Sequence, residues 1–195
     1  MVGIQDREHV EIRSIAKLES WLAKNSNSSS GAWIVTYKKN SSNRSPSYDE
    51  IVESLLIYGW IDSIPGKVDE FRSKLYVSPR KPTSAWSQAN KKRIAKLISE
   101  GRMKDAGLAA VAAAKKNGAW TQIDSAQTLQ VPKDLITAFR KFPGSAKNFG
   151  AFPPGVRRQI LEWISQAKTA PTREKRIIET ASKAQENIRA NQWRR

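Results

Sequence analysis

Six residues in the middle of the chain have side chains that could bind a small ligand. They are two tryptophans, one carboxylate, one guanidinium and two neutral polar groups, namely Trp60, Asp62, Arg80, Trp86, Ser87 and Asn90. If they converge, they form a cleft with aromatic walls in which Asp62 and Arg80 hold a small polar or anionic ligand. The alternative is structural: the tryptophans anchor the core, Asp62 neutralises Arg80 or accepts from loop amides, and Asn90 braces a turn.

Residue types that perform catalysis are scarce in this chain. His9 is the only histidine and there is no cysteine, so neither a Ser/His/Asp triad nor a histidine-rich or thiolate metal site is expected. The adjacent carboxylates Asp49 and Glu50 are explained by capping of a helix. The ten glycines are scattered singly, which predicts no glycine-rich phosphate loop. We therefore expect a protein that is not an enzyme, with no catalytic residue, no cofactor and no metal.

Positive charge is the strongest bias in the composition. The net charge is +16, and residues 64–195 carry the excess because charges are nearly balanced in residues 1–63. Basic clusters that could bind a polyanion contain Lys91, Lys92, Arg93, Arg157, Arg158, Arg173, Lys175 and Arg176, with Trp193 available for stacking on bases. No established DNA- or RNA-binding motif accompanies them. The charge favours weak, salt-sensitive and non-specific polyanion binding; specific nucleic-acid binding is the alternative function, and a solvated basic surface is the simplest interpretation.

The hydrophobic segments are short and interrupted by charged residues. None approaches the ~20 consecutive apolar residues that cross a bilayer, and the first eight residues mix charges where a signal peptide has an apolar run. We therefore expect no transmembrane segment and a cytoplasmic location. A basic C-terminal helix that ends at residues 191–195 could touch anionic headgroups, but core packing explains its narrow, alanine-rich stripe better.

Local patterns predict the elements that position these residues. The run Ser47-Tyr48-Asp49-Glu50 is a capping box that begins a helix, and Gly59 is a suitable left-handed residue for its end. Residues 33–37 are rich in β-branched and aromatic side chains, which predicts a buried strand. Residues 67–72 and 74–78 predict a hairpin. Together these strands predict a small antiparallel sheet.

The remainder of the chain is predicted to be helical. In its last helix, apolar positions recur at Ile177, Ala181, Ala184 and Ile188. Residues 119–131 show little periodicity and are interpreted as a boundary. The predicted fold class is therefore α+β and mostly helical. It has a domain with a small antiparallel sheet over residues 1–120 and a helical bundle over residues 121–195.

Three stretches together resemble the YdeI/OmpD-associated (bacteriocin-protection) family. They read YDE at 48–50 leading to GWID at 59–62, SPRKPTSAWSQAN at 78–90 leading to ISEGRM at 98–103, and AKTAPTREKRI at 167–177. Their order and spacing are similar as well, and the resemblance covers about residues 30–180. One departure is that Ser63-Ile64 follows Asp62, where family members commonly have Gly and then a polar residue. That departure places ligand contacts at this turn in doubt.

The resemblance implies a bacterial stress-tolerance protein without a catalytic mechanism. Family members are linked to tolerance of bacteriocins, cationic antimicrobial peptides or envelope stress, and some to a porin or envelope partner. We therefore expect a non-enzymatic binding protein of this type. Its charge argues for indirect protection and against direct sequestration of the toxic peptide. A protein of net charge +16 repels cationic peptides unless it has a local acidic patch.

Overall fold

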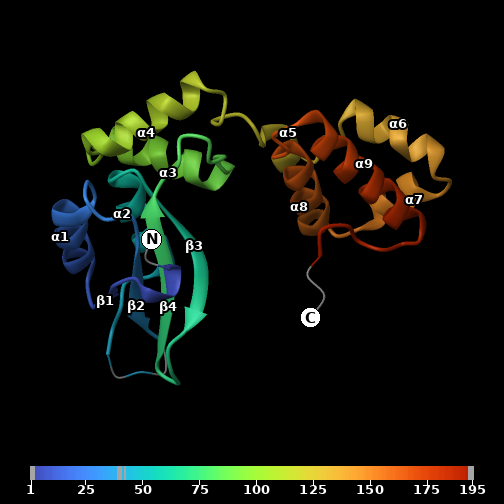
Figure 1. Cartoon of the computed structure of the whole chain (residues 1–195). Coiled ribbons are helices and arrows are strands. Elements are labelled where there is room, and N and C mark those ends of the chain that lie inside the picture. The colour runs from blue at the N-terminus through green and yellow to red at the C-terminus, as the bar shows by residue number, and fades with distance from the viewer. Residues whose placement is uncertain (1–2, 39–40, 42, 193–195) are drawn as a thin grey trace. The chain divides into compact units, whose positions relative to one another are not determined.

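The chain folds into two compact units. A computed structural model describes residues 3–38, 41 and 43–192 and is drawn in Figure 1. Residues 1–84 and 89–117 form one unit, called the N-terminal unit below, and residues 85–88 and 118–195 form the C-terminal unit. The fold class is α+β, as predicted, because strands occur in the N-terminal unit and the described elements of the C-terminal unit are helices.

A four-stranded sheet in the order β1-β2-β4-β3 organises the N-terminal unit. Its strands are β1 (His9–Glu11), β2 (Ala32–Tyr37), β3 (Trp60–Lys67) and β4 (Arg72–Pro79). The expected hairpin is β3–β4, but its first strand was misplaced, because β3 ends at Lys67 and residues 68–71 form the turn. The sheet is mixed and not purely antiparallel, because β1 pairs parallel with β2. Strand β1 is only three residues long, and a helix between β1 and β2 makes the crossover that parallel strands require.

One face of this sheet is covered by helices α1 (Ile15–Asn25) and α2 (Tyr48–Ile57). Successive strand residues point to opposite faces, and alternate residues such as Ile34 join Leu18 and Leu55 of these helices in one core. The predicted capping box is confirmed, with the Ser47 side chain accepting from the Glu50 amide and Glu50 accepting from the Ser47 amide. The other face carries side chains such as Trp33 and Val35 of β2, which are not members of this core.

Two further helices, α3 (Gln88–Ser99) and α4 (Asp105–Lys116), complete this part of the chain. Gly59 has φ +72 directly after α2, as the sequence predicted. In α4, Gly107 allows a close approach to α2, since a Cβ there would lie 2.4 Å from the Ile57 carbonyl oxygen. The N-terminal 3-10 helix η1 (Ile4–Asp6) lies near β2, where the Ile4 carbonyl accepts from the Trp33 indole.

The C-terminal unit is a helical bundle. Its helices are α5 (Asp124–Gln127), α6 (Lys133–Lys141), α7 (Ser145–Ala151), α8 (Pro154–Ser165) and α9 (Ala170–Gln185). The core contains Leu135, Phe149, Ile164, Ile177 and Ala181. The prediction that Ile188 continues the buried stripe of α9 is wrong. The helix ends at Gln185, Asn187 adopts φ +56, and Ile188 is 47% exposed.

No helix among the described residues is long and apolar enough to cross a membrane.

Candidate functional site

Trp60 is part of the core and not the wall of an open cleft. It begins β3 and is 1% exposed. Its ring lies 5.6 Å from that of Trp21 in an edge-on arrangement, and its indole nitrogen donates to the Ser26 carbonyl at 3.3 Å. Such contacts satisfy both the apolar body and the polar tip of a buried tryptophan. Trp60 therefore anchors the core, as the structural alternative to a ligand-binding role predicted.

Asp62 and Arg80 lie near Trp60 at the same end of the β3–β4 pair. Asp62 accepts a hydrogen bond of 2.7 Å from the Tyr48 hydroxyl. Tyr48 is 57% exposed, but partial desolvation of its hydroxyl together with this bond raises its pKa to about 12. Arg80 follows β4, and its amide donates to the Gly59 carbonyl at 2.9 Å. Burial lowers the pKa of Arg80 to about 10, and the negative charge of Asp62 opposes that shift.

The other three residues of the predicted cleft are divided between the two units. Trp86 is 1% exposed and its ring lies 5.1 Å from that of Trp120, within the C-terminal unit. Ser87, also in that unit, directly precedes α3. Asn90 belongs to the N-terminal unit and accepts a hydrogen bond from Arg93 within α3. The structure brings Trp60, Asp62 and Arg80 together, and convergence of all six residues stays a prediction.

Several cations of the predicted polyanion clusters have partners inside their own unit. Arg93 pairs with Asp49. Arg173 pairs with Asp134, and Arg176 donates to the Trp163 carbonyl with its guanidinium 4.9 Å from the Trp163 ring centre. The remaining cations of these clusters are partly or fully exposed: Lys91, Lys92, Arg157, Arg158 and Lys175. Trp193 lies outside the described residues. The clusters therefore combine structural cations with solvent-facing ones.

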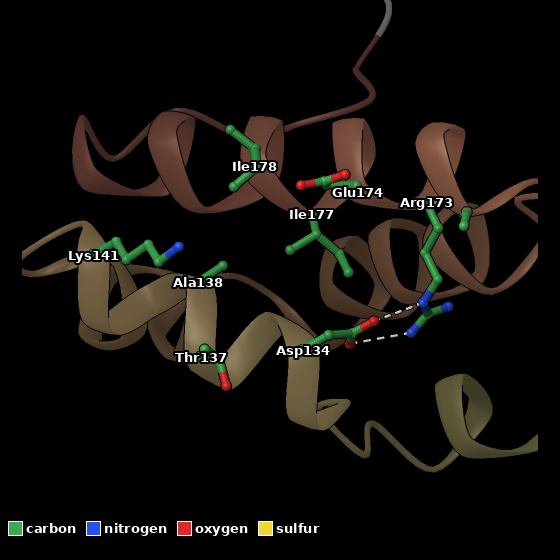
Figure 2. A pocket seen from close by; sticks show the side chains of 9 residues that line it. Asp134, Thr137, Ala138, Lys141, Arg173, Glu174, Ile177 and Ile178 are labelled. Atoms are coloured by element: carbon green, nitrogen blue, oxygen red, sulfur yellow. Dashed lines mark hydrogen bonds and ion pairs between the residues drawn. The ribbon is translucent and has the colours of Figure 1, made fainter.

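A hollow of about 520 Å³ opens between α6 and α9, and we call it the α6/α9 hollow. Figure 2 shows the side chains that line it from the two helices. They are Asp134, Thr137, Ala138, Lys141, Ala170, Arg173, Glu174, Ile177 and Ile178. Its floor is apolar, and charges of both signs surround that floor. A concave apolar surface with a few fixed polar groups is the usual form of a binding site.

An ion pair closes one end of the α6/α9 hollow. Arg173 donates from Nε and Nη2 to the two carboxylate oxygens of Asp134, at 2.7 and 3.2 Å. Arg173 holds the pKa of the Asp134 carboxyl below its usual value through these hydrogen bonds. The same guanidinium reaches the Ile164 carbonyl at the end of α8. This bidentate geometry fixes Arg173 in one position, so that the end of the hollow is preformed.

A second hollow, of about 470 Å³, lies on the sheet face opposite α1 and α2, and we call it the sheet-face hollow. It is lined by His9, Glu11, Val35, Lys67, Val68, Arg72 and Lys74. Lys74 lies 4.2 Å above the Trp33 ring and its ammonium is 3.2 Å from His9 Nε2. The hollow is basic, with Glu11 as its one acidic lining residue among those described.

Sequence reasoning missed both hollows. It gave no role to His9, which begins β1 and lines the sheet-face hollow. The three residues of β1 are too few for a periodic signal. Asp134 and Arg173 are 39 residues apart, and no local pattern links them. Within the ranges that the structure describes, no group of three or more His, Cys, Asp or Glu side chains could hold a metal ion.

Two protein-family models match different parts of the chain, and the boundary between the two matches falls near the boundary between the two units. Residues 10–110 match the model of a domain of unknown function (DUF8412), and residues 128–187 match the model described as bacteriocin-protection, YdeI or OmpD-associated. No curated protein and no solved structure shows a significant match. The resemblance to the bacteriocin-protection family is thus confirmed over the C-terminal helices, including the stretch at 167–177. The two earlier stretches lie inside the region of the other family. The chain belongs to the family of the domain of unknown function DUF8412, whose model spans just over half of it, and its residues 128–187 are similar to the bacteriocin-protection, YdeI or OmpD-associated family.

Proposed function

We propose that the protein is a non-enzymatic binding protein that acts in bacteriocin protection by engaging a protein partner through the α6/α9 hollow. The observation that carries this proposal is the position of the hollow. Its lining residues come from α6 and α9, and both helices lie inside the region that matches the bacteriocin-protection family.

The chemistry of the α6/α9 hollow suits a polypeptide surface. Ile178 is 40% exposed beside the buried Ile177, so that an apolar side chain of a partner can displace water from them. Lys141 and Glu174 flank this apolar surface and offer one charge of each sign. An apolar centre with a polar rim is the usual organisation of a protein interface.

The same charges argue against capture of a cationic peptide. The protein has a net charge of +16, and long-range repulsion slows the approach of a cationic ligand. Asp134 does not provide a compensating acidic patch, because Arg173 neutralises it. Protection through a protein partner follows from these charges more readily than sequestration of the toxin.

A survival assay with two matched variants tests the proposal. We would express the full chain in a bacteriocin-sensitive bacterium and compare it with Ile178→Arg and Ile188→Arg. Both residues are exposed isoleucines of the C-terminal unit, and Ile178 lines the hollow whereas Ile188 does not. Survival should increase with the parent chain and with Ile188→Arg, and should be lost with Ile178→Arg.

Two outcomes of that assay contradict the proposal. If the parent chain gives no protection, the protein does not act in this process. If Ile178→Arg protects as well as Ile188→Arg, the α6/α9 hollow is not the binding surface. Titration calorimetry with a cationic amphipathic peptide should show no heat of binding at physiological salt; tight binding would establish direct sequestration instead.

A second candidate function, polyanion binding, is favoured by the sheet-face hollow. Lys67, Arg72 and Lys74 line it together with one carboxylate, Glu11, and a second carboxylate, Asp69, pairs with Arg72 at 2.8 Å. Binding to single-stranded and duplex oligonucleotides across a salt series tests it, with Lys67→Ala as the variant and Lys24→Ala as its control, since Lys24 is exposed and lies outside the basic clusters and the hollow. Binding that survives physiological salt and weakens only in Lys67→Ala supports this function. Binding that disappears with salt for every polyanion alike shows non-specific attraction.

A further inference from the structure

A third hollow lies among α6, α7 and α8, and none of its lining residues lines the α6/α9 hollow. Its volume is about 500 Å³, and we call it the Arg157 hollow. It is lined by Val131, Ile136, Phe139, Arg140, Ala146, Phe149, Gly150 and Arg157. The size falls within the range of small-molecule sites.

The walls of the Arg157 hollow are apolar and aromatic. The ring centres of Phe139 and Phe149 lie 5.4 Å apart, and the two residues are 9% and 2% exposed. They therefore form a rigid base of the hollow. Ile136 is 43% exposed at the edge. A flexible hydrocarbon chain that lay against these side chains would remove apolar surface from water on both partners.

The only charged residues that line this hollow, among those the structure describes, are Arg140 and Arg157. Neither forms an ion pair with any described side chain. In contrast, Arg173 of α9, which lines the α6/α9 hollow, pairs with Asp134. The Nε atom of Arg157 is buried and has no hydrogen-bond partner within the described ranges. A buried donor without an acceptor is costly, and a carboxylate is the acceptor that fits a guanidinium in bidentate geometry.

We propose that the Arg157 hollow binds a free single-chain carboxylate amphiphile, with its carboxylate on Arg157 and its alkyl chain against Phe139 and Phe149. The argument is charge complementarity together with an apolar wall. It goes beyond the proposed function, because a ligand here leaves Ile178 and the α6/α9 hollow accessible to a protein partner.

Gly150 provides a way to fill the hollow without disturbing the fold. It lines the hollow on α7, and a Cβ added to it would meet no atom within 4 Å. Gly155, in the first turn of α8, is equally open but does not line the hollow. Gly150→Trp should therefore occupy the site with its own indole, and Gly155→Trp is the matched control.

Titration calorimetry of the full chain with decanoate, below its critical micelle concentration, tests the proposal. The parent chain and Gly155→Trp should bind one equivalent, and Gly150→Trp should show no binding. Arg157→Gln should weaken binding by at least about tenfold, because the carboxylate loses the guanidinium that pairs with it. Decyltrimethylammonium, which has the same chain and the opposite charge, should not bind. Circular dichroism checks that each variant is folded.

Three results would overturn this proposal. The first is no decanoate binding by the parent chain. The second is equal binding by Gly150→Trp and Gly155→Trp, which would place the ligand elsewhere. The third is equal affinity for decanoate and decyltrimethylammonium, which would show that Arg157 has no role. Binding to anionic phospholipid vesicles without binding to decanoate would identify a membrane surface as the ligand and would equally reject a free amphiphile.

Discussion

Replacing Gly107 with alanine should destabilise the N-terminal unit, although alanine is the better helix former. A Cβ at this position would lie 2.4 Å from the Ile57 carbonyl oxygen and 2.7 Å from the Leu56 carbonyl oxygen. An ordinary carbon–oxygen contact is about 3.3–3.6 Å, so that α4 must move away from α2 by about 1 Å. These two obstacles are backbone atoms, which cannot rotate aside as the third, the Cε atom of Met103 at 2.7 Å, can.

The size of the effect follows from two opposing terms. Overpacking of a core costs about 1–3 kcal/mol, and the rigid obstacle here places the cost near the upper value. Alanine returns about 1 kcal/mol through helix propensity. The net loss of unfolding free energy is therefore about 2 kcal/mol, and at roughly 4 °C per kcal/mol the melting temperature of this unit falls by about 8 °C.

Hydrogen exchange followed by mass spectrometry is the suitable assay, because it reports on peptides of each unit separately. Gly150→Ala is the control, since its added Cβ meets no atom within 4 Å and alanine should raise stability by about 0.5–1 kcal/mol. Protection of the α2 and α4 peptides should fall in Gly107→Ala and stay unchanged in Gly150→Ala. A Gly107→Ala protein as stable as the parent would refute the reasoning from close helix packing.

Three other predictions concern single interactions. The Asp134 pKa is depressed by Arg173, so the pair stabilises the C-terminal unit at pH values above the unfolded-state pKa of the carboxyl. This contribution is lost as pH falls through the folded-state pKa. In acid–urea titrations, Asp134→Asn should lose this part of the pH dependence, and an unchanged profile would count against a stabilising role of the pair. Asp62→Ala should lower the Tyr48 pKa from about 12 but keep it above 10, because the hydroxyl stays partly desolvated; absorbance titration at alkaline pH measures it, and an unchanged value would contradict the role of Asp62. Ser47→Ala removes the capping box and should cost about 1 kcal/mol in urea unfolding, whereas no loss would show that Glu50 alone suffices.

The local elements were predictable because their causes are a few residues apart in the chain. The capping box at Ser47 and the left-handed Gly59 were both confirmed. The strand predicted at residues 33–37 is β2, which begins one residue earlier. Strand β1 was missed because three residues carry no periodic signal, and its parallel pairing depends on a partner more than twenty residues away. Long-range pairing of this kind has no signature in either segment alone.

The candidate sites depended on contacts that the sequence does not display. The α6/α9 hollow is closed by Asp134 and Arg173, which are 39 residues apart, and the sheet-face hollow joins His9 to Lys74 across 65 residues. Arg173 was expected to serve a polyanion cluster, and it instead holds a carboxylate of a neighbouring helix. Whether a cation faces solvent or a partner is decided by distances in three dimensions, because a Coulomb interaction and a hydrogen bond both depend on separation in space.

The sequence by itself determined the α+β class, the strong positive charge and the resemblance to the bacteriocin-protection family. Composition and short-range spacing suffice for the fold class and the charge, since helix caps and strand patterns depend on neighbouring residues and net charge is a sum over the chain. The resemblance rests on the three stretches of sequence quoted above. Only the tertiary structure decided that Trp60 is a core residue, that Arg173 is paired and that Arg157 faces an apolar hollow. Each of these depends on which helix or strand packs beside the residue, and burial and pairing exist only after the chain has folded.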